Sequence, residues 1–175
     1  MSANGLLAGL VAITAPSGFV DPTGSAIIGF IAGILVCLSV AFIENKLKVD
    51  DPVGAISVHG ACGLWGVLSV GLFADGKSNY GGSWNGVTGS VTGLFYGDAS
   101  QLVAQLVGIA TLVGFVFTFS FILNWVLDAV LGQRVSAATE VEGLDIPEMG
   151  QLGYPEFVFK PEPAMMLAAE GEYVA

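Results

Sequence analysis

The chain has 175 residues, of which 54% are hydrophobic and only 11% are charged. Soluble domains carry about 25% charged residues, so this chain has too little charge to cover a water-facing surface, and its solvent must largely be lipid. The net charge of −10 argues against a nucleic-acid-binding protein, because phosphate contacts require lysine and arginine. We therefore expect an all-α, polytopic membrane helix bundle, with room for only a few spanning helices of roughly 20 residues each.

The first two apolar segments differ in length. As a helix, residues 5–15 would be only about 16 Å long, roughly half the thickness of a bilayer. We interpret this partial span as the end of a helix that begins outside this sequence. Residues 25–43 carry no charge and are long enough to span a bilayer.

The third apolar segment, residues 52–74, follows a charged loop at residues 44–51. Asp51 is placed to cap the free amides at the start of this helix. Pro52 suits the first helical turn, where a missing N–H is tolerated. We therefore predict that Asp51 and Pro52 form the cap of the third helix.

The last apolar segment follows a long loop. Residues 75–99 are rich in Gly, Ser, Asn and aromatic residues, and we expect a short re-entrant or interfacial piece around Trp84 to Tyr96. As a helix, residues 100–131 would be about 48 Å long, so this span must tilt or protrude from the bilayer. We therefore assign residues 1–133 to a transmembrane region.

Residues 134–175 form an acidic tail, because eight of the fifteen acidic residues of the chain lie between Glu140 and Glu172. The basic residues predict the orientation of the spans. Lys46, Lys48 and Arg134 fall on the same side when successive spans alternate in direction, and the positive-inside rule assigns this side to the cytoplasm. We therefore expect an integral protein of the plasma or inner membrane with a cytoplasmic C-terminus.

Few side chains of the spans could carry chemistry. Cys37 and Cys62 lie in apolar runs without a CxxC motif, and we interpret them as small hydrophobic residues. We expect no metal site and no cofactor. His59, the single histidine, lies near the middle of the third span, and at α-helical spacing its face includes Cys62 and Gly63.

Three interpretations of His59 stay open on local sequence. Ionisable groups inside membranes usually face a bundle interior or a transport pathway. The ring could be hydrogen-bonded to a neighbouring helix, or it could bind a haem or quinone, which requires a second histidine from a partner chain. It could also line a pore for a small polar solute, since a neutral imidazole offers one donor and one acceptor.

Long stretches of the sequence resemble one protein family. The run VDDPVGAISVHGACGLWGVLSVGLFADG (Val49 to Gly76) closely resembles the penultimate pore helix of ammonium transporters of the Amt/Mep/Rh family. Asn4 to Pro16 resembles the end of an earlier helix of that family. Gly132 to Gly150, followed by Tyr154 to Phe157, resembles its cytoplasmic tail. The resemblance covers nearly the whole chain except about its last dozen residues.

The resemblance implies a partial ammonium-transporter fold. Family members have eleven spanning helices, of which ten form two inverted halves around a narrow pore, and they assemble as homotrimers. This chain resembles the C-terminal portion, from the end of helix eight through helix eleven and the tail. The implied function is that of an ammonium and ammonia transporter fragment that is not an enzyme. An alternative is a regulatory or assembly partner of intact transporters, and another is a small haem-binding membrane subunit.

The resemblance also implies roles for individual residues. His59 corresponds to the second of two pore histidines, and Asp51 and Pro52 to a helix cap near the pore mouth. The partner histidine and the gate belong to helices that this sequence lacks. The resemblance further implies that ammonium is deprotonated at the outer mouth before ammonia passes His59. A dry apolar pore excludes any ion through the free energy of desolvation.

In the tail, Gly143, Leu144 and Asp145 correspond to the segment that packs under the pore, where PII-type nitrogen regulators bind. Three positions depart from the family pattern. Gly54 replaces an aspartate found in some members near the pore mouth. Pro147 replaces the phosphorylated threonine of plant members, and Met149 replaces a frequent histidine, so the contacts of this tail are expected to differ.

Overall fold

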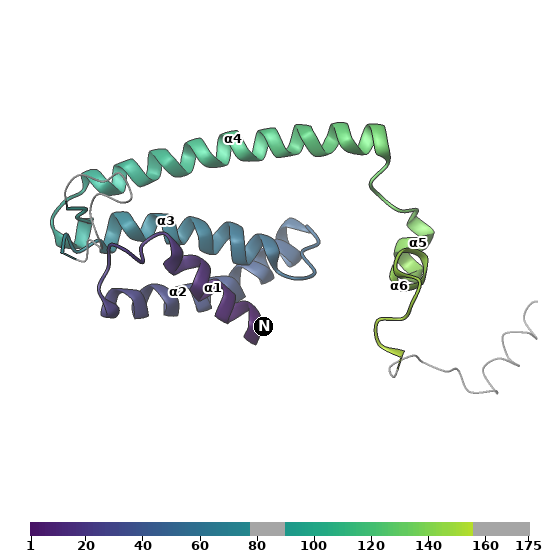
Figure 1. The fold of residues 1–175 in the computed structure, drawn as a ribbon, viewed down its shortest axis with the longest axis horizontal. Coiled ribbons are helices and arrows are strands. Elements are labelled where there is room, and N and C mark those ends of the chain that lie inside the picture. The colour runs from purple at the N-terminus through teal and green to yellow at the C-terminus, as the bar shows by residue number, and fades with distance from the viewer. Residues whose placement is uncertain (78–89, 156–175) are drawn as a thin grey trace, which may run out of the picture. The chain divides into compact units, whose positions relative to one another are not determined.

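The computed structural model describes residues 1–77 and 90–155. Every regular element in these two ranges is helical, which confirms the predicted all-α class (Figure 1). The α-helices are α1 (Ser2–Thr14), α2 (Pro22–Phe42), α3 (Cys62–Phe73), α4 (Ser100–Leu131), α5 (Ala137–Glu142) and α6 (Asp145–Met149). The π-helical segment η1 (Ile43–Leu47) extends α2, and a second one, η2 (Ile56–Ala61), precedes α3. A short 3₁₀ turn, η3, covers Leu94–Tyr96.

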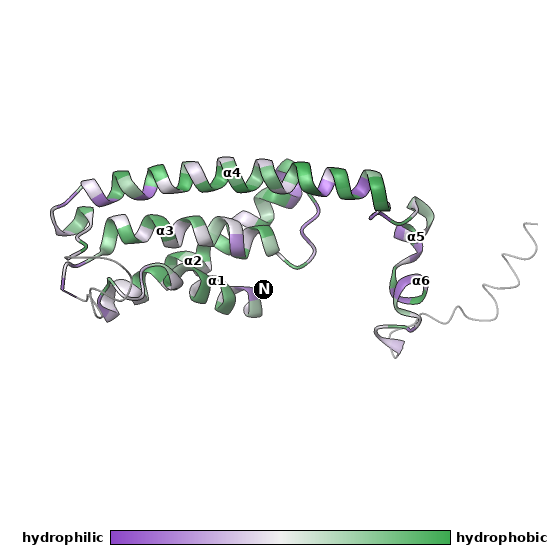
Figure 2. Cartoon of the chain, turned by 45° about the horizontal axis from the view of Figure 1, so that its top comes forward, coloured by the Kyte–Doolittle hydropathy of each residue, from purple (hydrophilic) through white to green (hydrophobic). Residues whose placement is uncertain are grey.

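Three of the described helices are long and apolar enough to cross a membrane. They comprise Pro22–Leu47, Ile56–Phe73 and Ser100–Leu131. The first helix, Ser2–Thr14, is apolar but shorter. The hydrophobic colour of α2 and α4 extends along most of their length in Figure 2.

The start of the third helix differs from the sequence prediction. Pro52 lies in a turn, Gly54 has a φ of 70°, and helical structure is regular only from Ile56. Pro52 therefore does not occupy the first helical turn. Helix α2 begins at Pro22, three residues before the predicted span, because Asp21 caps it by accepting a 2.6 Å hydrogen bond from the amide of Gly24.

The chain divides into two compact units, and residues 1–121 form the first. Its core is formed by small and β-branched side chains from α1, α2 and the η2–α3 helix. These buried residues include Ala8, Ala12, Ile28, Ala32, Val36, Val58 and Cys62. Small side chains let helix backbones approach closely, which is how helices associate where lipid competes for apolar surface.

Two contacts fix the α3 helix against its neighbours. A Cβ on Gly66 would lie 2.6 Å from the carbonyl oxygen of Ala12, so the backbones of α1 and α3 touch at this point. The indole N–H of Trp65 donates a 3.1 Å hydrogen bond to the carbonyl of Ile28 in α2. One face of the η2–α3 helix is therefore closed by α1 and α2.

The end of α3 is held by the chain that follows it. The amide of Gly93 donates to the carbonyl of Ala74 at 2.7 Å, and the amide of Asp75 donates to the carbonyl of Phe19 at 3.0 Å. The rings of Phe73 and Phe95 meet edge to face, with centroids 5.0 Å apart. Of the re-entrant piece expected around Trp84 to Tyr96, residues 84–89 lie outside the described residues, and Leu94–Tyr96 forms the 3₁₀ turn.

The second unit begins at Ile122, within α4, and its described part ends at residue 155. None of the residues of α4 is buried, although most of the helix is apolar. In α4, stacked phenylalanine pairs line the helix surface, with Phe115 and Phe119 centroids 6.0 Å apart. Such a surface requires a lipid or protein environment.

Gly66→Ala tests the close approach of α1 and α3. The added methyl group would clash with the Ala12 carbonyl, so we expect a loss of about 1–3 kcal/mol of stability, as is typical of overpacking. Gly63→Ala is the matched control, because its Cβ would lie 3.8 Å from Val11 Cγ1, an ordinary contact. Thermal unfolding of the purified protein in detergent measures both variants. Equal melting temperatures for the two variants would contradict this packing.

Candidate functional site

His59 lies in the π-helix η2, and its side chain is exposed in the described part of the chain. Ala55, Ile56 and Gly60 are exposed beside it, whereas Cys62 is fully buried in the core. The prediction that His59 and Cys62 share a face is therefore wrong. The π turn is the reason, because the amide of Cys62 bonds the carbonyl of Ser57, five residues earlier, and this spacing rotates α3 relative to an unbroken α-helix.

The carboxylate of Asp51 holds the start of this helix. Asp51 is only 4% exposed, and its oxygens accept hydrogen bonds from the amide of Ile56 at 3.1 and 3.2 Å and from that of Ser57 at 3.3 Å. The first amides of a helix have no partner within the helix. The Asp51 carboxylate therefore accepts hydrogen bonds from two amides for which the turn at Pro52 supplies no acceptor.

The backbone at position 54 favours the glycine that the sequence has there. Its φ of 70° is a conformation that side chains disfavour. A Cβ at this position would lie 2.5 Å from Nδ2 of Asn4, which donates a 3.0 Å hydrogen bond to the carbonyl of Val53. An aspartate at position 54 would therefore collide with the α1 residue that fixes the turn.

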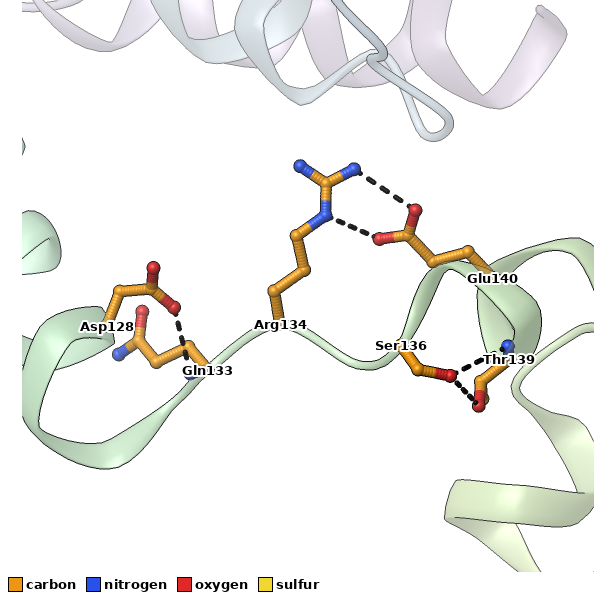
Figure 3. A network of polar contacts seen from close by, with 6 residues as sticks. All are labelled: Asp128, Gln133, Arg134, Ser136, Thr139 and Glu140. Carbon is orange, nitrogen blue, oxygen red and sulfur yellow. Dashed lines mark hydrogen bonds and ion pairs between the residues drawn. The ribbon is translucent and has the colours of Figure 1, made fainter.

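The tail contains a separate polar network. Arg134 forms two hydrogen bonds with the carboxylate of Glu140, at 2.6 and 3.1 Å, and Ser136 Oγ caps α5 by accepting from the amide of Thr139 (Figure 3). The hydrogen bond from Arg134 lowers the pKa of Glu140 below its ordinary value, and Glu140 raises the pKa of Arg134. Because the Arg134 side chain is 79% exposed, solvent screens this pair strongly.

The three predicted tail residues connect α5 to α6. Gly143 has a φ of 107° and ends α5, with its amide donating to the carbonyl of Thr139 at 2.9 Å. Leu144 is exposed and precedes α6. Asp145 begins α6, and its carboxylate accepts a 2.9 Å hydrogen bond from the amide of Gly153, which closes the turn after the helix.

The two departures in the tail lie in α6. Pro147 falls in the first turn, where its missing N–H needs no partner. Met149 is 72% exposed at the end of the helix. The short helix therefore forms with both substitutions.

Sequence reasoning missed two features of the site. The first is the π turn, which no hydrophobic periodicity reports, because it changes the hydrogen-bond spacing without changing residue types. The second is Asn4, which fixes the turn before the helix from a position far away in the sequence. The available signal for this contact was that Asn4 is a polar side chain at the start of an apolar segment.

Comparison with known proteins identifies the family. The model of the Ammonium Transporter Family matches residues 1–154. The chain belongs to this family. Together with three helices long enough to span a bilayer, membership makes it an integral membrane protein.

Individual relatives agree. Over 158 residues the chain is 43% identical to the ammonium transporter Amt2 of Archaeoglobus fulgidus, covering 90% of this chain and 33% of that protein. It is 38% identical to the ammonium transporter of Bacillus subtilis over 153 residues, covering 87% of this chain and 36% of that protein. The chain thus spans about a third of the length of these relatives.

Solved structures share the fold. A Sensor Amt Protein matches with a TM-score of 0.66 and 36% identity, over 83% of this chain and 33% of that one. A Mep2 mutant from Candida albicans matches with a TM-score of 0.66 and 28% identity, over 77% of this chain and 29% of that one. The predicted membrane helix bundle with a partial family fold agrees with both.

Asp51→Ala tests the helix cap. Two amides would lose their acceptor, so we expect a loss of about 1–2 kcal/mol of stability, the usual effect of removing an N-cap. Asp50→Ala is the matched control, because the neighbouring carboxylate is exposed. Thermal unfolding of both variants decides the matter. A melting temperature unchanged by Asp51→Ala would show that the cap contributes nothing.

Arg134→Gln tests the ion pair in the tail. In the native chain the pKa of Glu140 is lowered by the pairing. The pair therefore stabilises α5 fully at a pH above the ordinary pKa of a carboxyl group. This stabilisation is lost as the pH falls through the lowered pKa of Glu140. The substitution should return the pKa toward its ordinary value. A ¹³C NMR titration of the Glu140 carboxyl measures the change, and an unaltered titration curve would exclude the pairing in solution.

Proposed function

We propose that this chain supplies the C-terminal part of an ammonium transporter, with His59 as one of its pore histidines. The observation that carries the proposal is the position of the imidazole. His59 lies on the open face of an apolar helix whose opposite face is closed by α1 and α2. The relatives of the chain are named as ammonium transporters.

The surroundings of His59 suit a small neutral solute. Gly60 and Ala55 beside it have little or no side chain, so a solute can reach the ring closely. A neutral imidazole can donate one hydrogen bond and accept another. Ammonia fits this chemistry, whereas a potassium ion would have to shed its hydration without a compensating charge.

Selectivity then follows from proton loss. Ammonium can give up a proton before it enters an apolar pore, and potassium cannot. The uncharged ammonia has a far smaller desolvation free energy than either ion. In this proposal ammonia passes His59 and the proton returns by a separate route.

The tail completes the proposal. We place residues 134–155 on the cytoplasmic side, in agreement with the positions of Lys46, Lys48 and Arg134 along the chain. Gly143, Leu144 and Asp145 would then form the regulatory segment, with a PII-type protein as a candidate partner. The transporter would assemble as a homotrimer, and Asp51 would lie near the cytoplasmic pore mouth.

A chimera tests the function. Residues 1–154 of this chain replace the matching third of Amt2 from Archaeoglobus fulgidus, and the chimera is reconstituted in liposomes. We expect ammonium-dependent current and no potassium current. His59→Ala should lower the ammonium current by about tenfold or admit potassium, the expected effect of losing a hydrogen bond worth ~1.5 kcal/mol.

Leu38→Ala in the chimera is the matched control, because it truncates an exposed side chain of α2. It should leave current and selectivity unchanged. If His59→Ala behaved like Leu38→Ala, the assigned role of the histidine would be wrong.

A further inference from the structure

Ser57 is buried without a hydrogen-bond partner. Its side chain is fully buried, and its Oγ is the one buried side-chain nitrogen or oxygen without a partner among residues 1–77 and 90–155. A buried hydroxyl that makes no hydrogen bond is strongly unfavourable, and more so where lipid surrounds the helices. The group therefore requires an explanation.

The geometry of the helix start explains why Ser57 is exceptional. A serine or threonine in a helix usually donates its hydroxyl to the carbonyl four residues earlier. For Ser57 this carbonyl belongs to Val53, which lies in the turn before the helix and already accepts from Asn4. Other hydroxyls among the described residues do reach the carbonyl four residues earlier, at 2.7–3.0 Å, including those of Thr14, Ser25, Ser69 and Thr111.

The carboxylate of Asp51 accepts a hydrogen bond from the backbone amide of the same residue, Ser57. The amide nitrogen of Ser57 is 3.3 Å from Asp51 Oδ2, and the hydroxyl oxygen is three covalent bonds from that nitrogen. Asp51 is itself buried, at 4% exposed. An ionised carboxylate can accept about four hydrogen bonds, and the amides of Ile56 and Ser57 leave part of this capacity for another donor.

We propose that one water molecule is bound between Ser57 and Asp51. The Ser57 hydroxyl donates to the water, and the water donates to the Asp51 carboxylate. A water suits this position because it is small enough for a buried site and both accepts and donates, as internal waters do when they satisfy buried polar groups. The water links the cap to the π turn that carries His59, so it positions the histidine backbone without touching the solute.

A double-mutant cycle tests the site in the full chain, reconstituted in nanodiscs. We expect Ser57→Ala to lower the melting temperature by several degrees, because the bridging water loses one of its partners. In an Asp51→Ala background the same substitution should have less than half this effect. Ser69→Ala is the matched control, because the hydroxyl of Ser69 bonds within its own helix, and its effect should be the same in both backgrounds.

Three results would overturn the proposal. A melting temperature raised or unchanged by Ser57→Ala would show that the hydroxyl has no partner. Equal losses with and without Asp51 would show that its partner lies elsewhere. A melting temperature that rises when sodium or ammonium chloride replaces choline chloride, and only while Ser57 is present, would identify a cation instead of water.

A direct observation covers the case in which the Asp51 variant does not fold. In an experimental structure at a resolution that shows ordered water, a peak should lie within hydrogen-bond distance of Ser57 Oγ and of the Asp51 carboxylate. A well-ordered site without that peak contradicts the proposal.

Discussion

The hydrogen bonds that the amides of Ile56 and Ser57 donate to the Asp51 carboxylate are the constraint on which the candidate site depends. Backbone groups in an apolar environment must find partners within the protein, because lipid offers none. A helix that begins after a turn at Gly54 leaves its first amides open, and a buried side-chain acceptor is the local solution. The π-helical segment η2, which carries His59, begins at these capped amides.

The second constraint is the close packing on the opposite side of the same helix. Gly66 allows the backbone of α1 to touch α3, and Trp65 ties α3 to a carbonyl of α2. Only the contact between α1 and α3 at Gly66 is made without a large side chain. Both contacts orient the helix so that His59 and Gly60 remain on the face that the described residues leave open. The positions of the small residues thus account for both faces of the helix: Gly66 allows close packing against α1, and Gly60 leaves space beside His59.

Some features of the fold and of the candidate site could be predicted from the sequence and others could not, for reasons that differ by residue. The long, mostly apolar sequence of α4 and the solitary position of His59 are local properties, so composition and spacing report them. The start of the third helix is not local, because Asn4, far away in the sequence, contacts the turn at Val53 and Gly54. Pro52 has the right chemistry for a first helical turn but lies in the turn that precedes the helix. The partnerless hydroxyl of Ser57 likewise emerges only when the helix has a definite beginning.

The central claim is that the ring of His59 faces a solute pathway and not the acyl chains. Paramagnetic relaxation by spin-labelled lipid tails measures this directly, using imidazole resonances of His59 in the chimera with Archaeoglobus fulgidus Amt2. The account predicts that the His59 ring is protected from the lipid label, while methyl resonances of exposed Leu38 on α2 relax strongly. Relaxation of the His59 ring as strong as that of Leu38 would contradict it.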